Sequence, residues 1–591
     1  MLNAKLTPTL RLTNCFFKLV GLTSLALASS GAAHAQWRIS GADVPQLAAF
    51  DTAMKNIMTA QGASSAQLAV TWQGRLVLAH GYSLNPTSQD TVTEPDSLFR
   101  IASVSKPITA TLVHRLVQDG KLSLTQKLSE FVDLTPPAGR TTDARLSRIT
   151  VRHLLEHLGG FDLAVLGFDP IGYDAAIATA LGVSLPVSKA NIIKYMNGVA
   201  VAHEPGTTYA YSNYGYLLLA QIIERVSGLT YEKYAATVFT PIGIRTMRQG
   251  KTLLQNRAAG EVFYHSKYAN PSVMDNSGAV LPLPYGGGNN IENFDGLGSW
   301  VMSAIDAARW LSNLDAPTSA NAILNQTSIN RMLALPENFQ GAYTLGNYYP
   351  SAGWEVRNYG GGKYNTWFAG ALGGTTAYVV RLQTGLTYAA FFNQRGESSA
   401  GDFHGDIDVA LGNVINQISV WPINDLFPTP VVEYYNRDLD AYFITGRANE
   451  QSAVDGVASF QRTGGTFAAT SAATETAGLT PICRYYINIA SPYTSSHFYG
   501  PRDTDCAVIA AAKPAGFSYD GLDFAVTLPV SGACPATAPF VIYRSFRAGA
   551  NGKTSNHRFS TSLARYNEMT AKGWSPEGIV FCAARGTAAT Q

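Results

Sequence analysis

The chain has 591 residues, which is too many for one ordinary domain and enough to bury a large core. Charged residues make up 14% of the chain, below the usual quarter, and aromatic residues make up 11%. The formal net charge of +2 provides no basic field of the kind that attracts nucleic acids or anionic membranes. We therefore expect no nucleic-acid partner.

Residues 1–35 have the pattern of a secretory signal peptide. Lys5 and Arg11 precede an apolar stretch at 20–28, and Ala33-His34-Ala35 forms an A-x-A cleavage site. This pattern predicts a secreted or periplasmic protein. No later apolar run reaches the roughly 20 residues that span a bilayer, so no transmembrane segment is expected.

The first part of the mature chain leads to a Ser-x-x-Lys motif. Apolar residues recur with helical spacing over 43–62, and two alternating runs, 67–72 and 75–82, flank the turn Gln73-Gly74. These patterns predict a helix followed by a β-hairpin. The motif Ser103-Val104-Ser105-Lys106 comes next and opens a helical pattern that ends at Gly120.

Ser103 and Lys106 have the spacing that serine nucleophiles with a lysine base require. Residues three apart on a helix share a face, so the two side chains are expected to touch. A serine hydroxyl attacks poorly until a base takes its proton. Lysine is a base only when neutral, so its pKa must fall from about 10.4 to about 7, which burial can achieve. The motif alone is common and also fits a surface helix.

A second group of motifs lies about a hundred residues downstream. Pro205-Gly206-Thr207 precedes Tyr211-Ser212-Asn213, which leads into a helical pattern at 214–226 that closes on Gly228. Together with Ser-x-x-Lys, these motifs resemble the serine β-lactamase and penicillin-binding-protein superfamily, and most closely its class C, esterase and D-aminopeptidase branch. The resemblance covers roughly residues 40–418. It implies an α/β (α+β) fold of the β-lactamase/transpeptidase type, with an antiparallel sheet flanked by helices.

The same resemblance implies roles for the second group of residues. Tyr211 is expected to share acid and base work with Lys106, and Asn213 to hydrogen-bond Lys106 or the substrate. The segment 149–160 resembles a family helix that packs beneath the site, so His153 and His157 are expected to be structural and no metal site is predicted. Long loops at 250–295 are expected to cover the pocket and set substrate selectivity. The Gly-rich segment 296–303 is expected to serve close backbone approach before a helix at 304–314.

The third family motif is altered in this chain. In the family it is a Lys-Thr-Gly, His-x-Gly or Trp-x-Gly triplet on an inner strand, and its best match is Phe368-Ala369-Gly370, which lacks a polar or cationic first residue. Strands at 376–382 and 386–393 and a helix at 405–417 are expected to follow. We expect Trp367, Phe368 and Gly370 to contact substrate. The backbone amides of Ser103 and Ala371 are expected to form an oxyanion hole.

The rest of the chain consists of a linker and three repeats. Residues 419–430 are rich in proline and are expected to form a stiff linker. Beyond them, related motifs recur at intervals of about 50–60 residues, as Val432-Glu433-Tyr434-Tyr435, Cys483-Arg484-Tyr485-Tyr486 and Tyr543-Arg544-Ser545-Phe546. Short aromatic strands predict an all-β domain over 431–591, with the three-fold symmetry of a β-trefoil as one form. The segment resembles the uncharacterised tyrosine-rich repeat tail of secreted bacterial hydrolases. A cell-wall or polysaccharide ligand is a hypothesis for it.

Four cysteines lie beyond the linker, and Cys15 lies in the predicted signal peptide. An even number in an exported segment predicts two disulfides, and four cysteines allow three pairings. Cys483 and Cys506 bracket strands of the middle repeat, whereas Cys534 and Cys582 bracket the third repeat. We expect these two local pairs.

Taken together, these features predict a secreted serine hydrolase that forms an acyl-enzyme on Ser103 with a small-molecule acyl substrate and no cofactor. An esterase is the first hypothesis. A D-amino-acid peptidase, or a β-lactamase acting on penicillin-like amides, is the alternative. A second alternative is an inactive binding protein of the same fold, which the altered third motif favours.

Overall fold

The computed structural model describes residues 36–87, 89–319, 321–337, 339, 344–397, 402–472, 478–488, 496–549 and 555–583. The predicted signal peptide, residues 1–35, lies outside this described part. In the described residues, no helix has both the length and the apolar composition that crossing a membrane requires.

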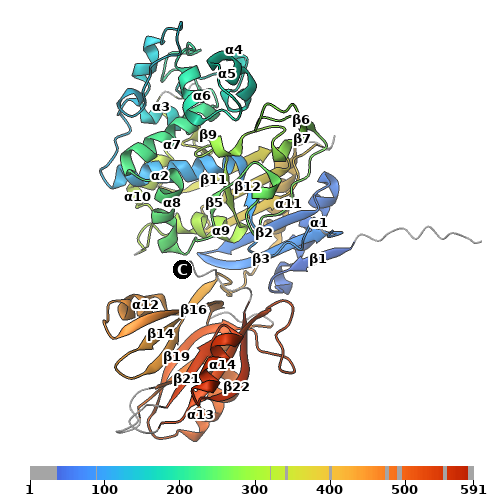
Figure 1. The fold of residues 1–591 in the computed structure, drawn as a ribbon, viewed down its shortest axis with the longest axis vertical. Coiled ribbons are helices and arrows are strands. Elements are labelled where there is room, and N and C mark those ends of the chain that lie inside the picture. Colours follow the sequence, from blue (N-terminus) through green and yellow to red (C-terminus); the bar gives the residue numbers. More distant parts are fainter. Residues whose placement is uncertain are drawn as a thin grey trace, which may run out of the picture. The chain divides into compact units, whose positions relative to one another are not determined.

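An antiparallel sheet forms the centre of the first domain (Figure 1). Among the described residues it has the strand order β1-β3-β2-β13-β12-β11-β10-β9. Its strands are β1 (Trp37–Ser40), β2 (Ser65–Trp72), β3 (Arg75–Leu84), β9 (Tyr348–Ser351), β10 (Trp354–Asn358), β11 (Tyr364–Leu372), β12 (Thr375–Arg381) and β13 (Leu386–Phe392). The N-terminal hairpin joins the later strands where β2 pairs with β13. The expected antiparallel sheet flanked by helices is confirmed.

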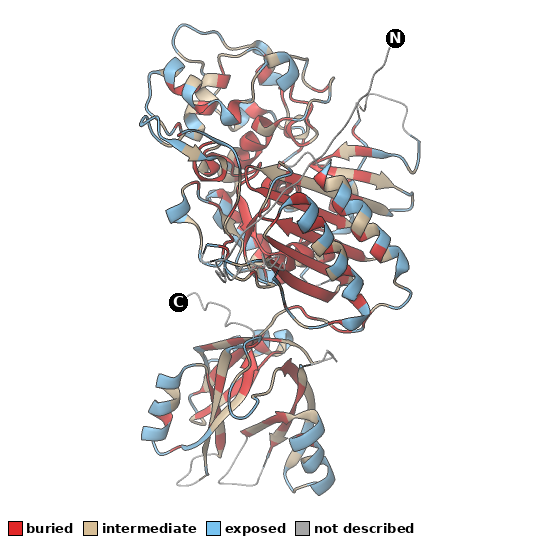
Figure 2. Cartoon of the chain, turned by 90° about the vertical axis from the view of Figure 1, so that its right-hand side faces the viewer, coloured by how far each residue is buried: buried red, intermediate tan, exposed pale blue. Residues whose placement is uncertain are grey.

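Helices cover both faces of this sheet, so its central strands are almost wholly buried (Figure 2). Tyr378 and Tyr388 donate hydrogen bonds to Asp408 of α11 (Phe403–Gln417), which packs with α1 (Ala48–Gln61). Gln67, whose register partner is Phe391, accepts a hydrogen bond from the amide of Ala304 in α9 (Ala304–Asn313). Tyr378 pairs with Ala390, the neighbour of Phe391, so α11 and α9 lie on opposite faces.

The first domain has further helices among its described residues, and α2 and α7 make most of the contacts between them. They are α2 (Ser105–Gln118), α3 (Val151–Leu155), α4 (Leu163–Leu166), α5 (Asp174–Leu181), α6 (Lys189–Met196), α7 (Asn213–Ser227), α8 (Tyr231–Phe239) and α10 (Gln326–Met332). α2 contacts α7 and α10, and α7 contacts α3 and α8. The hydroxyl of Ser212 caps α7 by accepting the amide of Gly215, and Gly228 ends it in the left-handed region.

Short strands connect this helical region with the main sheet. β4 (Phe99–Arg100), β5 (Arg248–Gln249) and β8 (Trp300–Met302) form a small sheet just before the Ser-x-x-Lys motif. β6 (Ala269–Pro271) and β7 (Val280–Pro282) form a hairpin within the long segment 250–295. β4 pairs with β8 directly before Ser103, and this pairing positions the backbone at the start of α2.

The predicted linker packs against the first domain as far as Phe427. The rings of Trp421 and Trp72 stack at 5.2 Å between centroids, and Leu426 and Phe427 are buried in the hydrophobic core of that domain. The amide of Leu426 donates to the carbonyl of Leu76 at 2.8 Å. The segment is thus held in place by core contacts, in addition to the stiffness of its prolines.

The tail is built from three repeats with the order strand, strand, helix, strand. The first repeat contains β14 (Thr429–Asn436), β15 (Ala441–Thr445), α12 (Ala448–Asp455) and β16 (Phe460–Ser471). The second contains β17 (Thr480–Ile487), β18 (Ser496–Pro501), α13 (Ala507–Ala512) and β19 (Phe517–Val526). The third contains β20 (Phe540–Arg547), β21 (Asn556–Ser560), α14 (Leu563–Ala571) and β22 (Ser575–Ala583). The second strands of the three repeats contact one another. The strand-rich repeats agree with the expectation, but the helix in each repeat distinguishes this fold from a β-trefoil, whose repeats contain only strands.

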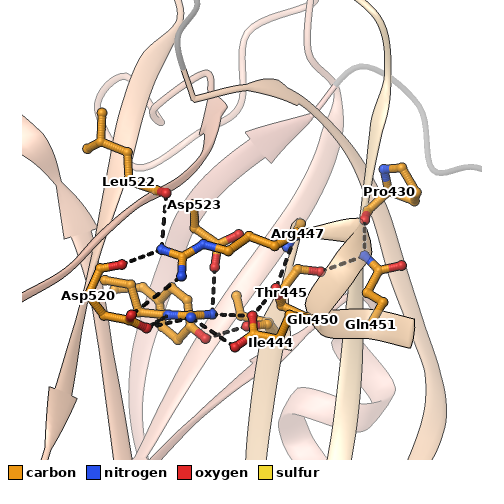
Figure 3. A network of polar contacts seen from close by, with 12 residues as sticks. Pro430, Ile444, Thr445, Arg447, Glu450, Gln451, Asp520, Leu522 and Asp523 are labelled. Carbon is orange, nitrogen blue, oxygen red and sulfur yellow. Dashed lines mark hydrogen bonds and ion pairs between the residues drawn. The ribbon is translucent and has the colours of Figure 1, made fainter. Parts of the chain in front are cut away.

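A buried ion-pair network joins the first two repeats (Figure 3). The side chain of Arg484 is 2% exposed and contacts Glu450 at 2.7 Å, Asp523 at 3.0 Å and also Asp520. Arg447 donates to the carbonyl of Leu522 at 3.1 Å. Disulfides join Cys483 to Cys506 and Cys534 to Cys582, which are the two pairs expected from the repeats.

Candidate active site

Ser103 lies in a tight turn at the start of α2. The turn is a 3-10 helix, Ala102–Val104, and Ala102 has a φ of +48°, in the left-handed region that favours glycine. Ser103 lines a cavity, whereas Ser105 is fully buried and its hydroxyl accepts a hydrogen bond from the amide of Trp300. Of the two serines in the motif, Ser103 is therefore the accessible one.

Lys106 is buried behind Ser103 and has three acceptors. Its Nζ donates to Ser103 Oγ at 3.0 Å, to Asn213 Oδ1 at 2.8 Å and to the carbonyl of Leu297 at 3.0 Å. Burial lowers the pKa of Lys106 to about 7, although the negative charge of Asp169 acts in the opposite direction. A large share of Lys106 is thus neutral at neutral pH, as a general base must be.

Tyr211 faces Ser103 from the other side. Its hydroxyl lies 2.8 Å from Ser103 Oγ, and its ring centroid lies 4.7 Å from Lys106 Nζ. Burial raises the pKa of Tyr211, although its hydrogen bond with Ser103 lowers it in part. The outer part of this residue remains open, with 40% of its surface exposed. Tyr211 is therefore a protonated phenol at neutral pH, and it can donate a proton near the serine.

His157 supports Tyr211 from behind. Its Nδ1 accepts the amide of Ser212 at 3.0 Å, and its ring centroid lies 4.8 Å from that of Tyr211. Burial lowers the pKa of His157 to about 3, so it is neutral. His153 instead accepts the amide of Thr150 at the start of α3. In the described part of the chain, no cluster of side chains could hold a metal ion.

Asn213 is oriented by a carboxylate that the sequence motifs do not reveal. Its Oδ1 accepts from Lys106, and its Nδ2 donates to Asp169 Oδ2 at 2.6 Å. This pairing fixes which end of the amide faces the lysine, because a carboxylate only accepts hydrogen bonds. Asp169 lies 44 residues before Asn213 in a segment without a recognisable motif, so sequence inspection had no signal for it.

The third motif lies directly against the backbone of the nucleophile. A Cβ atom on Gly370 would lie 2.3 Å from the carbonyl oxygen of Ile101 and 3.0 Å from the amide nitrogen of Ser103. β10 pairs with β11 only up to Trp367, so residues 368–372 leave one strand edge open beside Ser103. Glycine is therefore required at 370 by close approach. Ala371, the expected second oxyanion donor, follows on this edge.

A cavity of about 390 Å³ lies in front of these residues. Its lining residues are Ser103, Tyr209, Tyr211, Glu355, Trp367, Phe368, Ala369, Tyr378, Asp402, His404, Gly405 and Asp408. Four of the expected site residues, Ser103, Tyr211, Trp367 and Phe368, thus meet on one cavity. Lys106 and Asn213 lie behind Ser103.

The expectation that loops at 250–295 line the pocket is not met. None of these residues is among the described lining residues, which come from the turn that holds Ser103, the segment before α7, β10, β11, β12 and the start of α11. Arg257 lies over the ring of Phe263 at 5.8 Å, and Lys267 contacts the carbonyl of Glu397. Much of the long segment packs into the first domain instead, where Val262, Tyr264, Tyr285 and Ile291 are buried in the core, and only β6 and β7 form a hairpin.

An antiparallel sheet flanked by helices, with a serine and a buried lysine at the start of a helix, is the architecture of serine hydrolases with the β-lactamase fold. The Beta-lactamase family model matches residues 50–411, and the chain belongs to this family. A second model, a domain of unknown function called DUF5648, matches residues 429–584.

Two curated relatives match parts of the first domain. Penicillin-binding protein 4* of Bacillus subtilis is 27% identical over 226 residues, which are 38% of this chain and 46% of the relative. A putative fimbrial assembly protein FimD of Dichelobacter nodosus is 33% identical over 144 residues, 24% of this chain and 33% of the relative. The chain thus spans less than half the length of these relatives.

Two solved structures resemble this chain over almost their whole length. The octameric penicillin-binding protein homologue from Pyrococcus abyssi is 19% identical, with 76% of this chain and 95% of that chain covered and a TM-score of 0.46. A D-amino acid amidase from Ochrobactrum anthropi is 23% identical, with 62% and 99% covered and a TM-score of 0.45.

Proposed function

We propose that the protein is an acyl hydrolase that forms an acyl-enzyme on Ser103 and acts on small esters. The observation that carries this proposal is the placement of Ser103 Oγ within 3.0 Å of Lys106 Nζ and 2.8 Å of the Tyr211 hydroxyl. A base on one side and a proton donor on the other are what a serine needs for acyl transfer.

The proposed reaction has two steps. Neutral Lys106 takes the proton of Ser103 as Oγ attacks the acyl carbonyl, and the amides of Ser103 and Ala371 bind the oxyanion. The proton passes through Tyr211 to the leaving group, which departs as an alcohol and leaves the acyl group on Oγ. A water molecule then attacks this ester, gives its proton to the same groups, and releases the acid and free Ser103.

Esters are preferred in this proposal over penicillins because penicillins carry a carboxylate. Family members that process carboxylate-bearing substrates have a Lys or His at the third motif, whereas this chain has Phe368. None of the described lining residues is a lysine or arginine. A carboxylate without a partner costs several kcal/mol to bury, and each 1.4 kcal/mol is about tenfold in rate.

Because esters can be neutral and β-lactams carry a carboxylate, the cavity lining predicts which of the two is hydrolysed with the higher kcat/KM. We expect kcat/KM for short-chain p-nitrophenyl esters to exceed that for the β-lactam nitrocefin by at least about a hundredfold. Steady-state hydrolysis of both substrates by the mature protein measures the ratio. Equal rates would make β-lactamase the better proposal.

Covalent labelling tests the nucleophile. A fluorophosphonate probe should add its mass to the peptide that contains Ser103, and Ser103→Ala should abolish the adduct. Ser105→Ala is the matched control and should keep the adduct, because Ser105 is buried. Lys106→Ala should slow labelling by several orders of magnitude, since nucleophile and base act as a unit. A folded wild-type protein that takes no label would instead support the inactive binding protein.

A further inference from the structure

The cavity beside Ser103 has an acidic lining. Glu355, Asp402 and Asp408 all line it, and they come from two separate elements of the fold. Glu355 lies on β10, Asp402 caps the start of α11, and Asp408 lies within α11. The family motifs do not include these three carboxylates, and none of them takes part in the acyl-transfer steps proposed above.

Glu355 has a carboxylate oxygen without a partner. Its Oε2 is shielded from solvent and has no hydrogen-bond partner among the described residues. Its register partner on β11 is Trp367, which also lines the cavity. Burial and, to a smaller extent, the charge of Glu355 raise the pKa of Tyr209 to about 12, and Tyr209 lies on the same cavity as Tyr211. Burial also raises the pKa of Glu355 itself, because a shielded, unpaired carboxylate is costly unless a ligand compensates its charge.

Among the described residues, Asp402 and Asp408 form no ion pair with a lysine or arginine, and Asp402 Oδ1 lies 4.0 Å from His404 Nδ1. Asp408 accepts hydrogen bonds from the hydroxyls of Tyr378 and Tyr388, both at 3.2 Å. These donors are neutral, because burial and the charge of Asp408 both raise the pKa of Tyr378. Asp402 accepts the amide of His404, and its side chain is 78% exposed at the edge of the cavity. The charges of both aspartates are therefore available to a ligand.

The positively charged groups nearby do not offset this lining. Burial lowers the pKa of His404, and the charge of Arg395 acts in the same direction, so His404 is neutral at neutral pH. Arg395 itself does not line the cavity. The Nε2 atom of His404 lies 3.3 Å from the carbonyl of Gly370. Arg357 lies over the ring of Trp367 at 5.6 Å and does not line the cavity. Lys106 lies behind Ser103 and is occupied by its three acceptors. The cavity as a whole therefore favours positive charge.

We propose that the substrate of this site carries a positively charged nitrogen, an ammonium or quaternary ammonium group, which binds between Glu355 and the two aspartates of α11. This inference rests on the proposed function, because it names the substrate class for acyl transfer to Ser103. Tyr209 and Trp367 provide aromatic side chains in the same cavity, and aromatic faces attract organic cations. The negative charge of this lining also repels a carboxylate, so the site disfavours carboxylate-bearing substrates.

Two pairs of substrates that differ only in charge test the inference. On the leaving-group side, butyrylthiocholine is compared with S-(3,3-dimethylbutyl) thiobutyrate, in which a tert-butyl group replaces trimethylammonium. On the acyl side, the p-nitrophenyl ester of 4-(trimethylammonio)butanoate is compared with that of 5,5-dimethylhexanoate. We expect kcat/KM for the cationic member to exceed that of its neutral partner by at least about tenfold in one pair. The pair that shows the preference locates the charge relative to the reacting carbonyl.

Charge-neutral variants then assign the preference to residues. Glu355→Gln, Asp402→Asn and Asp408→Asn keep the side-chain shapes and should each reduce the ratio of cationic to neutral kcat/KM by at least about threefold. Asp406→Asn is the matched control on the same helix, because Asp406 contacts Gln61 and does not line the cavity. This control should leave the ratio as in the wild-type protein.

The outcomes separate this inference from the proposed function. Turnover of all four substrates with ratios near one, in a protein that takes the fluorophosphonate label, would overturn the inference and leave the hydrolase proposal intact. A preference that all three carboxylate variants retain would overturn the assignment to this lining. If the labelled protein turns over none of the four substrates, the inference also fails.

Discussion

At the residue scale, the state of Lys106 depends on two opposing effects. Burial lowers its pKa to about 7, and the charge of Asp169 prevents a further fall. Asp169 acts through space and also through Asn213, whose amide it orients toward Lys106. It therefore acts as a positioning residue, because its contact is with Asn213 and it does not line the cavity.

This balance predicts the pH dependence of the enzyme. Lys106 works as a base only when deprotonated, so kcat/KM for a neutral ester should rise with pH and reach half its maximum near pH 7. Asp169→Asn removes a charge that favours the protonated lysine. The rise of kcat/KM with pH should therefore occur at lower pH in this variant than in the wild-type protein. The asparagine can still accept the hydrogen bond from Asn213, so the site geometry is kept.

One control variant separates the effect of the Asp169 charge from a general effect of losing a carboxylate. Asp162→Asn is the control, since Asp162 pairs with His203 at 2.8 Å and is not among the causes of the Lys106 pKa shift. It should leave the pH profile of kcat/KM unchanged. If the rise of kcat/KM with pH moved to higher pH in Asp169→Asn, or moved equally in Asp162→Asn, the role assigned to Asp169 would be contradicted.

At the scale of elements, the tail repeats are joined by polar contacts as well as by their aromatic core. Arg484 lies on β17 and contacts Glu450 in α12 and Asp523 on β19. Asp523 has a fully buried side chain. A buried ion pair adds little stability compared with a hydrophobic replacement, but removing one partner leaves a costly charge behind.

Arg484→Met should therefore destabilise the tail by about 3–5 kcal/mol. The measurement is calorimetric unfolding of the mature protein, in which the tail transition should move to lower temperature. Lys572→Met is the control, because Lys572 forms a solvent-exposed pair with Glu568, and this substitution should leave the tail transition almost unmoved. Equal effects of the two substitutions would show that the buried network does not stabilise the repeats.

At the scale of the whole molecule, the first domain ends within the predicted linker, near its C-terminal end. Every residue assigned to the reaction precedes Trp421, but Leu426 and Phe427 belong to the core of the first domain. Arg309 lies over the ring of Phe427 at 4.2 Å and donates to the carbonyl of Pro428 at 3.2 Å. The tail begins with β14 at Thr429.

We expect a protein of residues 36–428 to keep the kcat/KM of the full mature chain on a soluble ester. A protein of residues 36–418 should lose about 3–6 kcal/mol of stability, because the burial of Leu426 and Phe427 contributes roughly 1.5–3 kcal/mol each. Denaturant unfolding and ester turnover measure both effects. Loss of turnover in folded 36–428 would show that the tail shapes the site.

The same pair of proteins addresses the proposed ligand of the tail. If the tail binds cell wall or polysaccharide, the full mature chain should sediment with purified peptidoglycan or an insoluble polysaccharide, and residues 36–428 should stay in the supernatant. Equal sedimentation of both proteins would assign any binding to the catalytic domain.

Local sequence patterns predicted much of the fold. The hairpin turn at Gln73-Gly74, the helix after Ser103 and the helix that ends at Gly228 all formed where their periodicity and turn residues indicated. The patterns missed short helices such as α4 and the short strands β9 and β10 at one end of the sheet, because such short elements are stabilised mainly by contacts with the rest of the domain.

What the sequence by itself determined was the set of motifs and their order: Ser103 and Lys106 three residues apart, Tyr211 with Asn213, and a third motif without a cation. These are local facts, set by spacing and residue type. Only the tertiary structure decided the pKa of Lys106, the link from Asn213 to Asp169, and the acidic cavity lined by Glu355, Asp402 and Asp408. These features depend on burial and on charges that meet from distant parts of the chain, and no local pattern encodes them.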